Sequence, residues 1–283
     1  MTGSMATEDA ELELFGNGRA GRCGFVAAHP DDELIMAGSR IGRAPNPLVV
    51  HVTDGAPYAP SLRSVRGSRR DYARLRRAET VAALALVGIS RRSILSLGAP
   101  DLEASFRMVA LAEHLARILV EQSVDTVVGH AYEGGHPDHD ATALITRAAL
   151  ALVQRQTGRV IRHVEAACYN SGSGRLTVGK FLPGDDASTV DVRLGTREWK
   201  IKKAMVACHA SQREVMLAMS VREERFRAAP RVVFTRAPHS GELYYEQLGL
   251  PLRGEDWRSL ARVALTELGL DHSARLPASA AGR

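Results

Sequence analysis

Cysteine is scarce in this sequence. Of its 283 residues only Cys23, Cys168 and Cys208 are cysteines, and no two of them have C-x-x-C spacing. An odd number without that spacing argues against a disulfide framework and against a cysteine zinc site. We therefore expect three small, buried, reduced side chains, as in proteins of a reducing compartment.

Aromatic residues are also few, at 5% of the chain. The formal charge of +5 and the pI near 9.4 suit an anionic partner, so a catalytically silent α/β module that binds a polyanion is one interpretation of the sequence. A surface that binds nucleic acid, however, needs aromatic side chains interleaved with its basic ones. With so few aromatics, we expect no nucleic-acid partner.

Long apolar runs are missing too, since none approaches the roughly 20 residues that span a bilayer. The first 14 residues are acidic and lack the basic and apolar regions of a secretory signal. We expect a cytoplasmic protein without a membrane span. The sequence leaves the oligomeric state open, a homo-oligomer included.

The composition is that of a globular protein, with 45% hydrophobic and 24% charged residues. Short apolar segments alternate with amphipathic ones, which predicts strands separated by helices. This alternation is typical of an α/β protein with a Rossmann-like, mostly parallel open sheet and helices on both faces. The expected strands are 23–28, 47–53, 93–97, 124–128 and 163–169, and the expected helices are 33–41, 69–87, 106–121 and 137–156.

The pattern divides the chain into four segments. They are a flexible N-terminal segment over 1–22, a Rossmann-like catalytic core over 23–170, a small C-terminal extension over 171–275 that packs on the core and shapes the pocket, and a disordered tail over 276–283. In the extension we expect short strands near 175–178 and 189–192, then helices over 197–210 and 214–226. A literal G-x-G-x-x-G at 16–21 precedes a strand, so it is not a dinucleotide-binding fingerprint.

Polar residues crowd the end of the first expected strand, where Ala28 is followed by His29-Pro30-Asp31-Asp32-Glu33. Three neighbouring carboxylates repel one another unless a cation or a proton holds them together. Imidazole nitrogen and carboxylate oxygen are both zinc ligands, and a catalytic zinc site takes three protein ligands and a water. Neighbours on one tight turn can supply at most two of the three, so another histidine must come from elsewhere.

A second polar cluster, Gly134-Gly135-His136-Pro137-Asp138-His139, follows the fourth expected strand. Pro137 suits the first position of a helix, and the two histidines are three residues apart, so both can face the same side of its first turn. In a doubly wound sheet of order 3-2-1-4-5, strands one and four are neighbours, and ligands bind at that switch point. The topology is therefore expected to bring together His29, Asp31, Asp32, His136, Asp138 and His139.

The two motifs, AHPDDE at 28–33 and GHPDH at 135–139, resemble the PIG-L/LmbE family of zinc-dependent deacetylases that act on N-acetylglucosamine derivatives. Weaker similarity extends over most of the chain. The resemblance implies an LmbE-like fold and a Zn²⁺ cofactor, and it implies that the zinc ligands are His29, Asp32 and His139.

The resemblance also implies roles for the residues around the metal. Asp31 would be the general base, His136 would face the developing oxyanion, and Asp138 would orient His136 or an adjoining group. Arg76 and Asp101 match positions that contact the sugar.

One position departs from a branch of the family. Mycothiol-biosynthetic members have a tyrosine two residues before the first histidine of the second motif, whereas this chain has Gly134 there. A mycothiol substrate is therefore not favoured, although Tyr132 lies near enough in the sequence to be a candidate substitute.

The expected function is that of a zinc-dependent hydrolase that removes the acetyl group from an N-acetylated amino sugar, or from its conjugate, with Asp31 as general base. Its partner would be a small N-acetylated sugar or glycoconjugate substrate. The alternative within the enzyme class is a metal-dependent amidase on another acyl-amine, in secondary-metabolite or thiol-conjugate chemistry. The arginines between residues 63 and 77 leave an anionic substrate open. No G-x-S-x-G motif supports a serine hydrolase.

Overall fold

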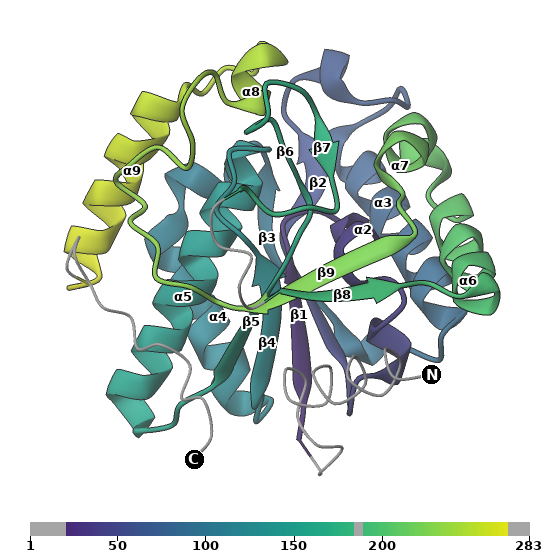
Figure 1. Ribbon diagram of the computed structural model, residues 1–283, viewed down its shortest axis with the longest axis horizontal. Coiled ribbons are helices and arrows are strands. Elements are labelled where there is room, and N and C mark those ends of the chain that lie inside the picture. The colour runs from purple at the N-terminus through teal and green to yellow at the C-terminus, as the bar shows by residue number, and fades with distance from the viewer. Residues whose placement is uncertain (1–20, 184–188, 271–283) are drawn as a thin grey trace.

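A computed structural model describes residues 21–183 and 189–270. The segments expected to be flexible or disordered, 1–22 and 276–283, lie outside these ranges except for residues 21 and 22. Seven strands form one sheet in the order β3-β2-β1-β4-β5-β9-β8 (Figure 1). The first five are parallel, β9 pairs antiparallel with β5, and β8 pairs antiparallel with β9. The expected α/β class and the order 3-2-1-4-5 are confirmed.

The strands of this sheet are β1 (Cys23–Ala27), β2 (Leu48–Pro57), β3 (Ile94–Asp101), β4 (Thr126–His130), β5 (Arg162–Ala166), β8 (Thr189–Arg193) and β9 (Glu223–Ala228). A small separate hairpin consists of β6 (Tyr169–Asn170) and β7 (Thr177–Val178). The α-helices are α2 (Asp32–Ala37), α3 (Arg69–Ala85), α4 (Met108–Glu121), α5 (Pro137–Thr157), α6 (Thr196–Ala207), α7 (Arg213–Met219), α8 (Tyr244–Gln247) and α9 (Gly254–Glu267). Short 3-10 helices span Ile41–Arg43, Pro60–Leu62, Arg91–Ser93, Ala104–Phe106 and Ala210–Gln212.

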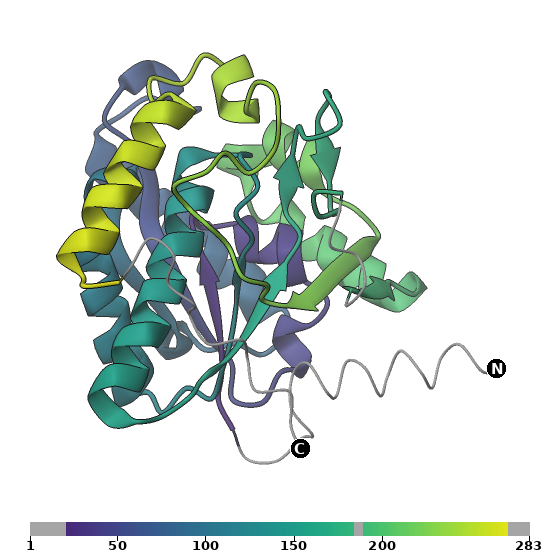
Figure 2. The ribbon, with the colours of Figure 1, turned by 60° about the vertical axis from the view of Figure 1, so that its left-hand side comes forward.

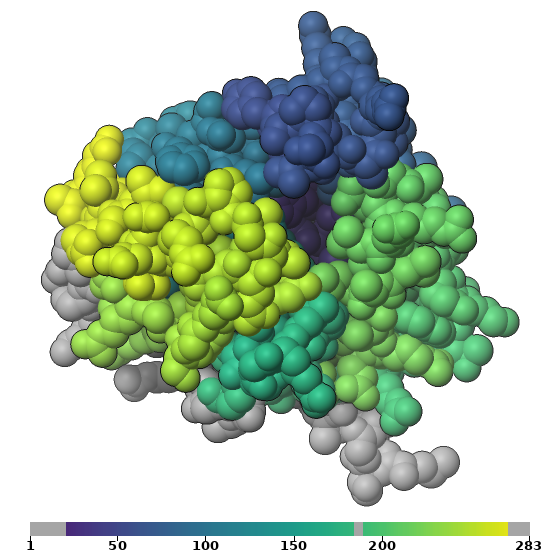
Figure 3. Space-filling view, turned by 90° about the horizontal axis from the view of Figure 1, so that it is seen from above, coloured from purple at the N-terminus to yellow at the C-terminus, as the bar shows by residue number. Residues whose placement is uncertain are grey.

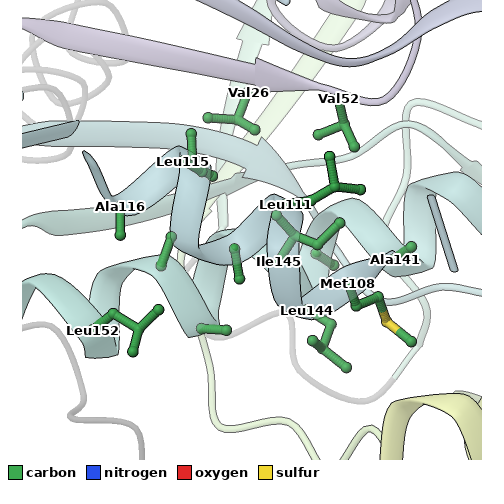
Figure 4. Packing of buried hydrophobic residues seen from close by; sticks show 14 of the residues in the cluster. Val26, Val52, Met108, Leu111, Leu115, Ala116, Ala141, Leu144, Ile145 and Leu152 are labelled. Atoms are coloured by element: carbon green, nitrogen blue, oxygen red, sulfur yellow. The ribbon is translucent and has the colours of Figure 1, made fainter. Parts of the chain in front are cut away.

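Helices cover both faces of the sheet, with α4, α5 and α9 on one side and α2, α3, α6 and α7 on the other (Figures 1 and 2). Successive side chains of a strand point to opposite faces. Val26 of β1 therefore packs in the first layer, where Figure 4 shows it near Leu115 of α4, and its neighbour Phe25 packs in the second. Because both faces are covered, β1 is buried along its whole length and reads as a continuous apolar run.

The C-terminal extension differs from the sequence prediction. The helix expected over 214–226 ends at Met219, and Glu223–Ala228 is strand β9. Strand β9 supplies hydrogen-bonding partners to β5, which would otherwise be an exposed edge. The extension thus enlarges the sheet itself. Within the described ranges, no helix combines the length and the apolar composition that crossing a membrane requires.

A buried ion pair fastens the extension to the core. Lys202 of α6 is fully buried, and its Nζ donates to Oε1 of Glu224 on β9 at 2.7 Å and to the carbonyl of Ile35 on α2 at 3.1 Å. The other carboxylate oxygen of Glu224 accepts a hydrogen bond from the hydroxyl of Ser39 at 2.6 Å. Three segments that are distant in sequence therefore meet at one charge pair.

Replacing Lys202 tests how much this ion pair contributes to the stability of the fold. In Lys202→Met an unbranched apolar chain takes the place of the cation, and the Glu224 carboxylate stays buried without it. We expect the free energy of unfolding to fall by about 3–5 kcal/mol, because breaking a buried pair leaves an uncompensated charge. Urea unfolding measures this change. The exposed Lys200→Met on the same helix is the control and should stay within about 0.5 kcal/mol. Equal stability of the two variants would contradict the stabilising role of the Lys202–Glu224 pair.

Candidate functional site

The two polar clusters lie side by side at the carboxyl ends of β1 and β4. The strands are neighbours in register, with Val26 opposite Gly129, so the residues that follow them emerge at the same edge of the sheet. Seen from this edge, the surface is hollowed. The purple N-terminal part of the described chain lies at the floor of the hollow, between blue, green and yellow segments (Figure 3).

Two imidazoles converge on one carboxylate oxygen at this site. Oδ2 of Asp32 lies 3.0 Å from Nδ1 of His29 and 3.2 Å from Nε2 of His139. All three residues are buried. Burial by itself would raise the pKa of Asp32, but His139 and His29 hold that pKa well below its ordinary value. The site therefore presents an anionic oxygen between two ring nitrogens.

The second ring nitrogen of His29 faces carboxylates as well. Its Nε2 lies 3.0 Å from Oδ1 of Asp101 and 3.3 Å from Oδ2 of Asp138. Asp138 is fixed in turn, because its carboxylate accepts hydrogen bonds from the backbone amides of Leu102, at 2.6 Å, and Ala104, at 3.1 Å. Histidines that bind metals typically face a carboxylate with their other nitrogen, which fixes the ring.

The donor set suits a zinc ion. Two imidazole nitrogens and a carboxylate oxygen are the ligand types of a catalytic zinc site that leaves one position open. Other combinations also lie close together. In the described ranges, three groups have ligand atoms that all lie within 4.8 Å of one another, and each shares members with the predicted set without matching it: His29, His136 and His139; His130, His139 and Cys168; and His29, Asp101 and Asp138.

Asp31 takes a different direction from Asp32. Its φ is 147°, a backbone conformation that residues other than glycine rarely adopt. Nη2 of Arg76 donates to Oδ2 of Asp31 at 2.9 Å and to the carbonyl of Pro30 at 3.0 Å, and Glu33 accepts a hydrogen bond from the Asp31 amide. Burial raises the pKa of Asp31 to about 7, although Arg76 opposes the rise. A carboxylate with such a pKa suits proton transfer at neutral pH.

His136 caps the helix that carries His139. Its Nδ1 accepts the backbone N–H of Asp138 at 3.2 Å, and Pro137 holds the first helical position, as expected. Burial holds the pKa of His136 well below its usual value, so the ring is neutral. Since Nδ1 accepts a hydrogen bond, the proton of the neutral ring is on Nε2. The His136 ring centre lies 4.7 Å from that of His29 and 5.3 Å from that of His139.

Tyr169 also belongs to the site, and sequence reasoning did not single it out. Its hydroxyl lies 3.5 Å from Nε2 of His139, and the two ring centres are 4.9 Å apart. Burial raises the pKa of Tyr169 well above its ordinary value, so the hydroxyl keeps its proton. The available signal was position, because Tyr169 closely follows β5, the neighbour of β4, and reaches the same edge of the sheet.

The contacts in the structure answer two questions that the sequence left open, one about Tyr132 and one about the arginines between residues 63 and 77. Tyr132 does not replace the tyrosine absent at position 134, because its ring stacks on Trp257 at 5.2 Å and its hydroxyl donates to the carbonyl of Arg236.

The arginines between 63 and 77 mostly bind groups of the chain itself. These contacts are Arg63 with Gly67, Arg69 with Asp54, Arg74 with Asp71, Arg76 with Asp31, and Arg77 with Ile94.

Known proteins resemble the chain in fold and in the segment that holds the site. No curated protein matches it. Among solved structures, the N,N'-diacetylchitobiose deacetylase from Pyrococcus horikoshii is 20% identical with a TM-score of 0.52, over 75% of this chain and 78% of that one. A deacetylase of teicoplanin biosynthesis, in complex with teicoplanin, is 18% identical with a TM-score of 0.54, over 73% and 96%.

The same fold also occurs in an enzyme of another class. The 4-carboxy-2-hydroxymuconate hydratase from Pseudomonas putida is 17% identical with a TM-score of 0.52, over 75% of this chain and 98% of that one. At such identities the similarity shows the fold and not the reaction. A match to a protein family, unlike a similarity of fold, depends on the amino-acid sequence itself. The family described as PIG-L, GlcNAc-PI de-N-acetylase, matches residues 25–150, a range that includes both polar clusters. The chain therefore carries a PIG-L family domain over residues 25–150.

Proposed function

We propose that the protein is a zinc-dependent deacetylase that removes the acetyl group from an N-acetylated amino sugar, of the N-acetylglucosamine type, or from its conjugate. The observation that carries the proposal is the convergence of His29 Nδ1 and His139 Nε2 on Oδ2 of Asp32. The family domain and the deacetylases of the same fold support this class of reaction. A cytoplasmic location goes with it, supported by three free cysteines.

His29, Asp32 and His139 would hold the metal. When bound, zinc lowers the pKa of a coordinated water to about 7 and polarises a carbonyl as a Lewis acid. Asp138 and Asp101 keep the His29 ring in place through its second nitrogen. Loss of that orientation would weaken metal binding, as for other carboxylates that orient metal-binding histidines.

Asp31 and His136 would carry the proton transfer and the charge stabilisation. Asp31 accepts the proton of the attacking water, and the oxygen of that water bonds to the acyl carbon. His136 donates its Nε2 proton in a hydrogen bond to the acyl oxygen, where negative charge develops. Asp31 then returns the proton to the leaving nitrogen as the C–N bond breaks, which yields acetate and the free amine.

Arg76 and Asp101 are the proposed sugar-contacting residues. Asp101 retains 17% exposure of its side chain and faces the site beside His29. Arg76 is only 4% exposed, and its guanidinium is already bound to Asp31 and to the carbonyls of Pro30 and Gly55. Its contacts therefore support a second role, which is to hold the Asp31 carboxylate in position.

Metal dependence is the first test. A chelator should abolish acetate release from N-acetylglucosamine or its conjugates, and zinc should restore it. His29→Ala and His139→Ala should each purify with little zinc, because two ligands are too few for a stable site. Elemental analysis measures the metal. His114→Ala on α4 is a control that should keep full occupancy. Stoichiometric zinc in His29→Ala would refute the ligand assignment.

The general base and the oxyanion donor are tested at constant metal content. Asp31→Asn should keep zinc and lose about 10²- to 10⁴-fold in kcat, the usual contribution of general acid–base catalysis. His136→Ala should keep zinc and lose about 10²- to 10³-fold, as for a single oxyanion donor. Asp54→Asn, which alters another carboxylate paired with an arginine, is the matched control. Turnover near the wild-type value in Asp31→Asn would exclude that carboxylate as the base.

Arg76→Met separates positioning from substrate binding. If Arg76 acts by holding Asp31, kcat should fall at least about 10-fold while KM changes little, because the loss concerns the transition state. A direct contact with the sugar predicts instead a rise in KM. Steady-state kinetics give both constants. Arg69→Met, which breaks the pair with Asp54, should leave both unchanged, and circular dichroism should show that both variants are folded.

A further inference from the structure

Tyr169 brings a hydroxyl to the centre of the site from a third strand end. After β5 the chain enters the β6–β7 hairpin, where Tyr169 pairs with Val178. The hydroxyl lies 3.5 Å from Nε2 of His139, which is also the atom that faces Oδ2 of Asp32. The tyrosine oxygen is therefore next to the nitrogen proposed to bind the metal.

The position of this ring is built into the fold. A Cβ at residue 135 would overlap the carbonyl oxygen of Tyr169 and lie 3.0 and 3.1 Å from two of its ring carbons, so glycine there makes room for the tyrosine. On another side, the ring of Tyr244 meets it edge-on at 5.9 Å, and the Tyr244 amide donates to the carbonyl of Gly134. The second cluster and α8 together hold the hydroxyl where it is.

We propose that Tyr169 is a further catalytic residue, whose hydroxyl donates a hydrogen bond to the acyl oxygen of the substrate. The proposal rests on the proposed deacetylase function. A ring nitrogen that binds a metal has no lone pair left to accept a hydrogen bond. Once His139 binds zinc, the Tyr169 hydroxyl therefore needs another acceptor, and the acyl oxygen gains negative charge as the reaction proceeds. Tyr169 would then work with His136, and two donors on separate elements would share one oxyanion.

Tyr169→Phe removes the donor and keeps the ring that packs on His139 and Gly135. We expect kcat for acetate release from N-acetylglucosamine to fall on the order of 10²-fold, the typical loss for one oxyanion donor, with KM within about 3-fold of wild type. Binding gives a second readout. A methylphosphonamidate of glucosamine mimics the tetrahedral state, and its affinity for Tyr169→Phe should also fall on the order of 10²-fold. Zinc affinity, measured by chelator competition, should not change.

Tyr244→Phe is the matched control, since it removes a hydroxyl from the neighbouring ring, and it should leave kcat and analogue binding unchanged. Wild-type kcat in Tyr169→Phe, from a preparation whose wild type releases acetate, would overturn the role of Tyr169 and leave the deacetylase proposal standing. A loss of zinc affinity in Tyr169→Phe would overturn it too, because the hydroxyl would then act on the metal. Failure of the zinc-loaded wild type to release acetate from any N-acetylated amine would overturn both proposals.

Discussion

The structure depends on keeping four carboxylates, three of them buried, close to one histidine. Asp32, Asp101 and Asp138 all contact the ring of His29, and Asp31 precedes Asp32 directly. Buried like charges at such distances are unfavourable unless cations or hydrogen-bond donors compensate them. The compensation comes from several elements at once, since α3 supplies a guanidinium, the loop after β3 supplies backbone amides, and α5 supplies a second imidazole. A bound divalent cation would add to it, which is why the cluster and the metal proposal belong together.

The C-terminal extension contributes to this arrangement by holding the second cluster. The indole of Trp257 donates to the carbonyl of Pro137 at 3.1 Å, and the Tyr244 amide donates to the carbonyl of Gly134 at 2.9 Å. On the other side of the site, the amide and the hydroxyl of Ser211 both bind the carboxylate of Glu79 on α3. The extension thus contacts both α3, which carries Arg76, and the turn that carries His136. The described part of the extension therefore contacts elements on both sides of the site.

The sequence was sufficient for the parts of the site that follow from connectivity. Two polar turns after strands one and four must meet if the strands are neighbours, and they do. It was insufficient wherever a contact depends on side-chain direction or on pairing between distant segments. Nothing local distinguishes Arg76 from the other arginines of α3, although it alone is bound to Asp31. Strand β9 pairs with the edge of β5, and its own sequence, which is rich in charged residues, does not indicate this pairing. Tyr169 reaches His139 only because residue 135 is glycine and the hairpin turns back over it.

The adjacent residues Asp31 and Asp32 show how geometry gives two identical side chains opposite properties. The unusual backbone at Asp31 lets its carboxylate turn to Arg76 while the next carboxylate turns to His29 and His139. One cation does not offset the burial of Asp31, whose pKa rises to about 7, whereas two imidazoles more than offset that of Asp32. Separation of pKa values between neighbouring carboxylates is how enzymes obtain an acid–base group and a permanent anion from the same residue type. The unusual backbone at Asp31 is therefore part of the geometry that gives the two carboxylates different partners.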